Sequence, residues 1–264
     1  MEAAIFDLDG TLVDSEQYGH RIAFNEAFEH FGLPDRWDRE LYRELLATTG
    51  GERRLYGWLS SPASEFAGRP EEERRQMAKD LHRWKTRRFT EMAAAGAIPV
   101  RPGAVDWLDD LAAAGARLAI ATTGSREWVI PLLDKTFGAD RFEVVVAGDE
   151  VAHRKPDPEA YTLALSRLDV AADQAVAVED SRPGWESAAN AGVTCVVVAN
   201  EETDLEAAAG PSGPPLVLAD FLPQAPAIAP SAIVDRFGVV DSGDRDHSPA
   251  AVLGRLLACA TMER

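Results

Sequence analysis

Short apolar runs alternate with longer segments of helical hydrophobic spacing along most of the chain. A run that is apolar at every position predicts a strand buried on both faces, as in parallel sheets. We expect strands near residues 3–6, 118–121, 143–147, 175–179, 193–199 and 216–218, and helices near 104–114, 127–137, 157–168 and 184–191. Helices that alternate with such strands predict an α/β fold, a Rossmann-like parallel sheet with helices on both faces.

One long segment departs from this alternation, because residues 15–96 show helical spacing and no convincing strand. A first helix is predicted from Asp14 or Ser15, and the Gly-Leu-Pro sequence at 32–34 is a strong stop signal. Pro70 followed by three glutamates predicts another helix start, since acids favour the positive end of the helix dipole. Because the first predicted strand belongs to the sheet, this all-helical block is predicted to be an insertion after it.

The end of the chain differs in composition from the rest. Beyond Leu222 it is rich in proline and then in acidic and turn-forming residues, and Ser248-Pro249 predicts the start of a last helix. The apolar residues on one face of that helix are Val252, Leu253, Leu256 and Leu257. We therefore expect three parts, which are a discontinuous core domain of residues 1–14 and 97–222, a helical domain of residues 15–96, and an extension of unknown role at 223–264.

The charge of the chain argues against some classes of partner. Its formal net charge is −17, which disfavours binding to nucleic acids or to anionic membranes. An anionic substrate would then need a local pocket of positive charge. The fractions of hydrophobic residues, 46%, and of charged residues, 27%, are those of an ordinary soluble globular protein.

Cysteine content and hydropathy predict a cytoplasmic protein. Cys195 and Cys259 are too few for a disulfide framework or a structural zinc site. No apolar run approaches the length of a membrane span, and the first predicted strand begins at residue 3, which leaves no room for a signal peptide. The sequence is compatible with a monomer or a homodimer.

The first predicted strand ends in the segment AAIFDLDGT, residues 3–11, which contains two acids one residue apart. In an extended chain alternate residues face the same way, so the carboxylates of Asp7 and Asp9 can point at one spot. Gly10 allows a sharp turn there. Two acids at a strand end suit a hard divalent cation together with a nucleophile and a proton shuttle, whereas the plainer interpretation is an Asp-Gly turn.

Further polar groups follow later predicted strands, where a parallel sheet binds its ligands. They are Thr122, Lys155 in HRKPDP, and Glu179 with Asp180 in AVEDS. Each alone has an ordinary explanation as a helix cap, a solvated charge or a turn. Together with Asp7 and Asp9, in this order, they resemble the motifs of the haloacid dehalogenase-like phosphohydrolases, and the resemblance covers residues 1–222.

Segments of the inserted block are similar to one branch of this family. DSEQYGHRIAFNEAF, WDRELYRELLATTGGERR and LHRWKTRRF are similar to the CbbY-like branch, which is close to β-phosphoglucomutase and whose characterised members dephosphorylate xylulose-1,5-bisphosphate. The resemblance implies that the helical block is a cap domain. It also implies a Mg²⁺-dependent phosphatase that hydrolyses a small sugar phosphate, xylulose-1,5-bisphosphate or a similar ketose bisphosphate, through an aspartyl-phosphate intermediate.

Two alternatives to this function remain at the level of the sequence. A sugar phosphomutase of the β-phosphoglucomutase type shares the whole catalytic set and differs only in passing the phosphoryl group to a sugar hydroxyl. A non-catalytic binding protein on the same fold is the other alternative. The complete set of acids together with Lys155 weighs against it, because loss of one would be expected.

The resemblance implies a role for each catalytic residue. Asp7 is the nucleophile that becomes phosphorylated. Asp9 is the general acid that protonates the leaving oxygen and then the base that activates water, and for the first role it must hold a proton near neutral pH. Thr122 and the following backbone amide hydrogen-bond the phosphoryl group, and Lys155 neutralises its charge. The implied Mg²⁺ ligands are Asp7, the main-chain carbonyl of Asp9, Asp180, and Glu179 as a ligand or an outer partner.

The resemblance also implies which residues bind the sugar phosphate. They are Glu16, His20, Gly51, Arg54 and Lys85 in the cap, with Thr123 and Arg126 just after Thr122. For Arg54 and Lys85 the alternative is a charged helix face in solvent. Lysine is scarce in this chain, which favours a functional interpretation of Lys85. For His20 a structural hydrogen bond within a helix is a nearly equal alternative.

Overall fold

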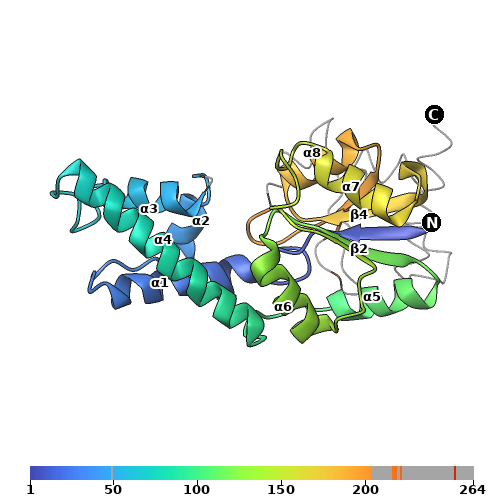
Figure 1. The fold of residues 1–264 in the computed structure, drawn as a ribbon, viewed down its shortest axis with the longest axis horizontal. Helices are drawn as coiled ribbons and strands as arrows, with labels where there is room; N and C mark the ends of the chain where they lie inside the picture. Colours follow the sequence, from blue (N-terminus) through green and yellow to red (C-terminus); the bar gives the residue numbers. More distant parts are fainter. Residues whose placement is uncertain (49, 204–215, 219–220, 222–252, 254–264) are drawn as a thin grey trace. The chain divides into compact units, whose positions relative to one another are not determined.

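The computed structural model describes residues 1–48, 50–203, 216–218, 221 and 253 (Figure 1). These residues form two compact units. Unit 1 comprises Met1–Val13 and the described residues from Val100 onward, and unit 2 comprises Asp14–Pro99. Of the helix predicted after Ser248, only Leu253 lies among the described residues, and the rest of the predicted extension at 223–264 lies outside them.

Unit 1 contains a parallel sheet whose described strands have the order β3-β2-β1-β4-β5-β6. The strands are β1 (Ala3–Phe6), β2 (Arg117–Ala121), β3 (Val144–Val146), β4 (Ala175–Glu179), β5 (Thr194–Val198) and β6 (Leu216–Leu218). Strand β1 pairs with β2 on one side and β4 on the other, with Ala3 opposite both Arg117 and Ala175. Every residue of β1, β4 and β5 is buried, which explains their continuous apolar runs. Since all pairs are parallel, the carboxyl ends of the strands meet at one edge.

Helices cover both faces of this sheet. They are α5 (Ala104–Ala113), α6 (Arg126–Phe137), α7 (Glu159–Leu168) and α8 (Arg182–Asn190), with a short 3₁₀ turn η2 (Ala172–Gln174) before β4. Figure 1 shows α7 and α8 on one face of the sheet and α5 and α6 on the other. Tyr161 of α7 and Trp185 of α8 belong to one buried cluster with Ala3 and Ile5, because alternate residues of a strand face the same side.

Unit 2 is inserted between β1 and α5, and its described part contains helices and loops without a strand. The elements are a π-helical turn η1 (Glu16–His20), α1 (Arg21–His30), α2 (Arg39–Leu45), α3 (Gly51–Leu59) and α4 (Glu71–Ala94). Its core is aromatic, since Trp37 is fully buried with its ring centroid 4.9 Å from that of Phe24 and 5.0 Å from that of Phe28. The side chain of Asn25 bonds both the amide and the carbonyl of Trp37, which fixes the loop before α2. The predicted fold class, a parallel α/β sheet with an inserted helical block, is confirmed.

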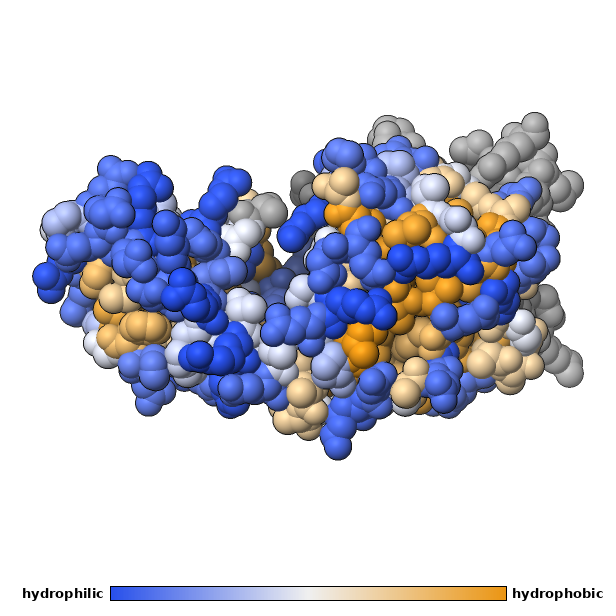
Figure 2. All heavy atoms as spheres, in the orientation of Figure 1, coloured by the Kyte–Doolittle hydropathy of each residue, from blue (hydrophilic) through white to orange (hydrophobic). Residues whose placement is uncertain are grey.

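The surface of unit 2 reflects the high charge of the chain. Figure 2 shows mostly hydrophilic side chains on its visible face. The longest helix, α4, has three glutamates in its first turn. None of the described helices combines the length and the apolarity that spanning a bilayer requires.

Candidate active site

Asp7 and Gly10 form a tight turn at the carboxyl end of β1. Asp7 is 6% exposed, and its backbone amide donates to the carbonyl of Val178 in β4 at 2.9 Å. Gly10 has a φ of 79°, and a Cβ at this position would lie 2.3 Å from Oδ2 of Asp180. A larger residue would therefore collide with this carboxylate. The glycine turn brings the first acidic segment directly against Asp180.

Lys155 joins the ends of three strands. Its Nζ donates to Oδ1 of Asp7 at 2.6 Å, to Oε1 of Glu179 at 2.5 Å and to the carbonyl of Ala121 at 2.8 Å. Its side chain is 4% exposed. Burial alone would lower the pKa of Lys155, but the charges of Asp7 and Glu179 outweigh burial and hold this pKa above its ordinary value. Lys155 is therefore a permanent positive charge among buried acids.

Glu179, the last residue of β4, is fully buried beside Lys155. The hydroxyl of Tyr161 donates to the same Oε1 at 2.7 Å, and burial together with the charge of Glu179 raises the pKa of this phenol. Oε2 lies against Gly184, where a Cβ would be only 1.9 Å away. Protein atoms thus enclose both oxygens of Glu179. The carboxylate of Glu179 in turn holds Lys155 in place. Tyr161 was not among the predicted residues, because an aromatic residue on an amphipathic helix is ordinarily a core residue.

Asp180 lies just beyond β4, and neutral groups hold its carboxylate. The hydroxyl of Thr11 donates to Oδ1 at 3.0 Å, and the side-chain amide of Asn200 donates to Oδ2 at 2.7 Å. Burial, followed by the charge of Glu179, raises the pKa of Asp180 to about 7. These contacts fix the carboxylate in place without neutralising its charge.

Three buried carboxylates converge at this edge of the sheet. Oxygen atoms of Asp7, Glu179 and Asp180 lie within 4.8 Å of one another. Burial raises the pKa of Asp7 well above its ordinary value, Lys155 opposes this shift, and the neighbouring carboxylates add to it. A buried set of oxygen ligands with excess negative charge fits a hard divalent cation such as Mg²⁺. Because Glu179 is fully buried, with Lys155 and Tyr161 bonded to Oε1 and Gly184 against Oε2, the other two carboxylates are the better candidates for ligands.

The remaining predicted residues of unit 1 differ in their exposure. Asp9 is half-buried in the turn after β1. Thr122 follows β2, is 1% exposed, and its hydroxyl accepts from the backbone amide two residues on at 3.1 Å. Thr123 is exposed, and Arg126 at the start of α6 forms an ion pair with Glu150 at 3.1 Å. Contact of Thr123 and Arg126 with a substrate stays a prediction.

Unit 2 buries two of the predicted substrate-binding cations. Arg54 on α3 and Lys85 on α4 are 9% and 8% exposed. Both lie near the ring of Phe24, at 5.9 Å and 4.8 Å from its centroid. Nζ of Lys85 also lies 2.8 Å from Nδ1 of His20. A solvated helix face would leave these side chains exposed, so that alternative is wrong for both.

Tyr42 on α2 connects Arg54 to Glu16. Its hydroxyl donates to Oε2 of Glu16 at 2.7 Å and accepts from Nη1 of Arg54 at 3.1 Å. Burial, and then the charge of Glu16, raises the pKa of Tyr42, so the phenol keeps its proton. Nε of Arg54 donates to the carbonyl of Leu45 at 3.0 Å. Tyr42 was not predicted, because its position among the leucines of a helix indicates a core residue.

Gly51 begins α3 for a steric reason. A Cβ at this position would lie 2.8 Å from the ring of His82 and 3.3 Å from that of Phe24. His82 is half-buried on α4, one helical turn before Lys85, and it was not among the predicted residues. Packing against His82 therefore requires a glycine at position 51. Contact of Gly51 with a substrate stays a prediction.

The His20→Gln variant is expected to lose less stability than the wild type as the pH falls. Burial lowers the pKa of His20 well below its ordinary value of 6.5, and the charges of Lys85, Arg54 and His82 add to this effect. The folded protein favours neutral His20, so its contribution to the free energy of unfolding is full above pH 6.5 and is lost as the pH falls through the folded-state pKa.

Urea unfolding about one pH unit above and about two units below the ordinary histidine pKa measures this contribution. The decrease in the free energy of unfolding between the two pH values should be smaller for His20→Gln, because glutamine does not titrate. Equal decreases for the two proteins would show that His20 is not held neutral by the fold.

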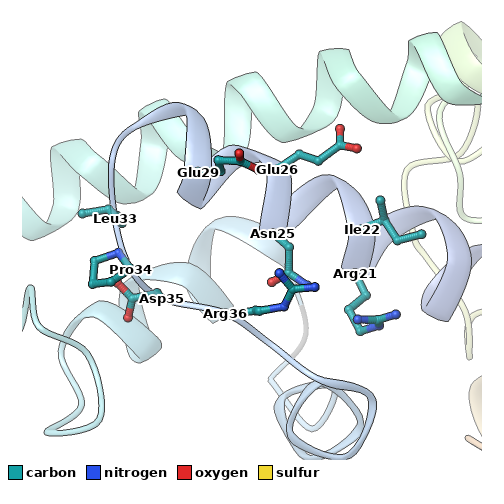
Figure 3. A pocket seen from close by; sticks show the side chains of 9 residues that line it. All are labelled: Arg21, Ile22, Asn25, Glu26, Glu29, Leu33, Pro34, Asp35 and Arg36. Atoms are coloured by element: carbon teal, nitrogen blue, oxygen red, sulfur yellow. The ribbon is translucent and has the colours of Figure 1, made fainter.

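An open pocket of about 680 Å³ lies beside α1 and the loop that follows it (Figure 3). Its lining residues are Arg21, Ile22, Asn25, Glu26, Glu29, Leu33, Pro34, Asp35 and Arg36. None of the predicted site residues lines it. Charges of both signs lie around it, and two of its polar side chains already bond the carbonyl of Trp37. It is therefore not the candidate active site.

Known proteins resemble this chain in sequence and in structure. The family model of the haloacid dehalogenase-like hydrolases matches residues 1–192. Protein CbbY of Cereibacter sphaeroides is 45% identical over 200 residues, which are 75% of this chain and 84% of that protein. Crystal structures of CbbY from Rhodobacter sphaeroides in complex with phosphate, and of a mutant in complex with xylulose-(1,5)bisphosphate, are 42% identical to this chain. Their TM-scores are 0.67 and 0.66, and each comparison covers 84% of this chain and 95% of the other. The chain therefore belongs to the haloacid dehalogenase-like hydrolases, as its motifs predicted, and is a phosphatase of that family.

Proposed function

We propose that this phosphatase is Mg²⁺-dependent and hydrolyses xylulose-1,5-bisphosphate or a similar ketose bisphosphate through an aspartyl phosphate. Unit 1 is the catalytic core, and unit 2 is the cap domain that binds the second phosphate. The observation that carries the proposal is the bond between Lys155 and Asp7, 2.6 Å long, at the end of β1. The complex of a related CbbY with xylulose-(1,5)bisphosphate supports the choice of substrate.

In this proposal Asp7 and Asp9 carry the two chemical steps. A carboxylate oxygen of Asp7 attacks phosphorus, the bond between phosphorus and the sugar oxygen breaks, and Asp9 gives its proton to that oxygen. Asp9 then takes a proton from water, the water oxygen attacks phosphorus, and the bond to Asp7 breaks to release phosphate. Lys155 and Thr122 hold the phosphoryl group, and the charge of Lys155 stabilises the negative charge that it carries.

Asp7, Asp180 and the main-chain carbonyl of Asp9 would hold Mg²⁺, while Glu179 orients Lys155. The basis is the set of contacts of each carboxylate, since Glu179 already accepts from Lys155 and Tyr161 and is fully buried. When bound, the metal supplies positive charge to the transferring phosphoryl group. Because protein atoms enclose Glu179, it does not contact the metal in this proposal and acts only through Lys155.

Buried positive charge in unit 2 supports a substrate with a second phosphate. Arg54 and Lys85 are both nearly inaccessible and lie over one aromatic ring. In a chain with a net charge of −17, two cations that lie near one ring form a local positive region, which is what an anionic substrate needs. Arg54 offers a planar fork to phosphate oxygens, and Lys85 offers a point charge.

Replacing Arg54 or Lys85 with alanine is expected to lower kcat/KM for a ketose bisphosphate far more than for p-nitrophenyl phosphate. Loss of one charge-assisted contact costs about 1.5–3 kcal/mol, which corresponds to a decrease of about ten- to a hundredfold. The small ester has no second phosphate, so its hydrolysis should change little. Binding energy from a remote group acts by aligning the reacting phosphorus.

Two exposed neighbours provide matched controls for these variants. Arg53→Ala on α3 and Lys79→Ala on α4 remove the same kind of charge from the same helices, and both residues are exposed. They should leave both activities within a few-fold of wild type. If Arg54→Ala and Lys85→Ala reduce the two activities equally while the proteins stay folded by circular dichroism, unit 2 does not bind a second phosphate.

A further inference from the structure

Asn200 connects the two acidic segments of unit 1. Its side-chain amide donates to Oδ2 of Asp180 at 2.7 Å and to the carbonyl of Gly10 at 3.0 Å, which uses both amide hydrogens. Its side-chain oxygen accepts from the backbone amide of Glu202 at 2.8 Å. Reversing the amide would place its oxygen against two acceptors, so these contacts fix the orientation of Asn200.

Thr203 and Arg101 hold Asn200 in this position. The hydroxyl of Thr203 accepts from the backbone amide of Asn200 at 2.9 Å and donates to the carbonyl of Asp180 at 2.7 Å. Arg101 donates to the carbonyl of Gly10 at 2.8 Å and to two carbonyls at the end of β5, at 3.0 Å and 2.6 Å. The loop that carries Asn200 is thereby attached to the same turn that Asn200 contacts.

The hydrogen-bond donors of Asp180 fix its carboxylate without placing a positive charge on it. Thr11 donates to Oδ1 and Asn200 to Oδ2, so one neutral donor holds each oxygen. Each carboxylate oxygen has a second lone pair, which remains for a cation. Without Asn200 the carboxylate would keep only the bond from Thr11 and would be free to rotate about it.

We propose that Asn200 is a positioning residue that fixes the carboxylate of Asp180 for Mg²⁺ and thereby sets the affinity of the site for the metal. The inference rests on the proposed Mg²⁺ site but not on the identity of the sugar. Groups that orient a metal ligand typically change the affinity for the metal by about 10- to 100-fold. Asn200 does not touch the transferring phosphoryl group in this proposal, so its loss should be compensated by more metal.

Titration calorimetry of the full chain with MgCl₂ tests the proposal, with Asn200→Ala compared with the wild type. The dissociation constant for Mg²⁺ should rise by about 10- to 100-fold. Phosphate release from p-nitrophenyl phosphate, measured against Mg²⁺ concentration, should need correspondingly more metal and reach a similar maximal rate. Gln174→Ala is the control. Gln174 lies just before β4, and its side-chain amide bonds Glu2 and none of the carboxylates of the site. This variant should bind Mg²⁺ as the wild type does.

Three results would overturn the inference. One is unchanged Mg²⁺ binding by Asn200→Ala, and another is a loss of activity that no Mg²⁺ concentration restores. If wild-type protein does not bind Mg²⁺ at all, both this inference and the proposed metal site fail, whereas the first two results leave the metal site standing. Should Asn200→Ala be unfolded by circular dichroism, Asn200→Ser is measured in its place, with a smaller rise expected because its hydroxyl keeps one donor.

Discussion

Asp7→Asn is expected to lower turnover by at least about 10⁴-fold while leaving the protein folded. The amide oxygen of asparagine is a far weaker nucleophile than a carboxylate, so the aspartyl phosphate does not form. The shape of the side chain is kept, and Lys155 retains its bonds to Glu179 and to the carbonyl of Ala121. One negative charge is also removed from a crowded set of carboxylates, which offsets the loss of the ion pair with Lys155.

Phosphate release at saturating substrate and thermal unfolding measure these two effects. Asp173→Asn is the control, because Asp173 is exposed in η2, before the amino end of β4, and its replacement should leave turnover unchanged. Turnover of Asp7→Asn within tenfold of the wild type would remove Asp7 from the role of nucleophile.

Asp9→Asn should also be nearly inactive, and it should trap phosphorylated Asp7, which intact-protein mass detects.

Chelation of Mg²⁺ with excess EDTA is expected to lower turnover by at least about 10³-fold. Three buried carboxylates lie within 4.8 Å of one another, and Lys155 is bonded to two of them. An incoming phosphate adds more negative charge, so approach to Asp7 is strongly unfavourable without a divalent cation.

Added Mg²⁺ in excess of the chelator should restore turnover, and circular dichroism in EDTA should show that the chain remains folded. Full activity in excess EDTA would contradict the proposed metal site. It would leave the family of the chain unaffected, because that assignment rests on the match over residues 1–192.

Much of the fold was predictable because its strands are short apolar runs, and those of β1, β4 and β5 are buried at every residue. The runs at 3–6, 175–179 and 216–218 coincide with β1, β4 and β6. The abrupt change from apolar to acidic at Phe6-Asp7 marks a strand end, which is why the strand-end acids were also predictable. The helix predicted from Asp14 or Ser15 begins instead with the π-helical turn η1, because hydrophobic spacing does not reveal one extra residue in a turn.

The residues that hold the predicted groups in place were not predictable. Asn200 lies 190 residues from Gly10 and 20 from Asp180, yet it bonds both. Tyr42 and Tyr161 resemble core aromatics in the sequence, and only the fold places their hydroxyls against glutamates. Spacing identifies groups at strand ends, whereas partners that come from distant segments depend on the packing of the whole unit.

Phosphate release from a panel of sugar mono- and bisphosphates, with and without Mg²⁺, tests the central claim most directly. We expect xylulose-1,5-bisphosphate or a similar ketose bisphosphate to be hydrolysed at least about tenfold more efficiently than any monophosphate, with no release in EDTA. Equal efficiency for mono- and bisphosphates would contradict the proposed substrate class. Isomerisation of a sugar phosphate without release of phosphate would identify a phosphomutase and contradict the account.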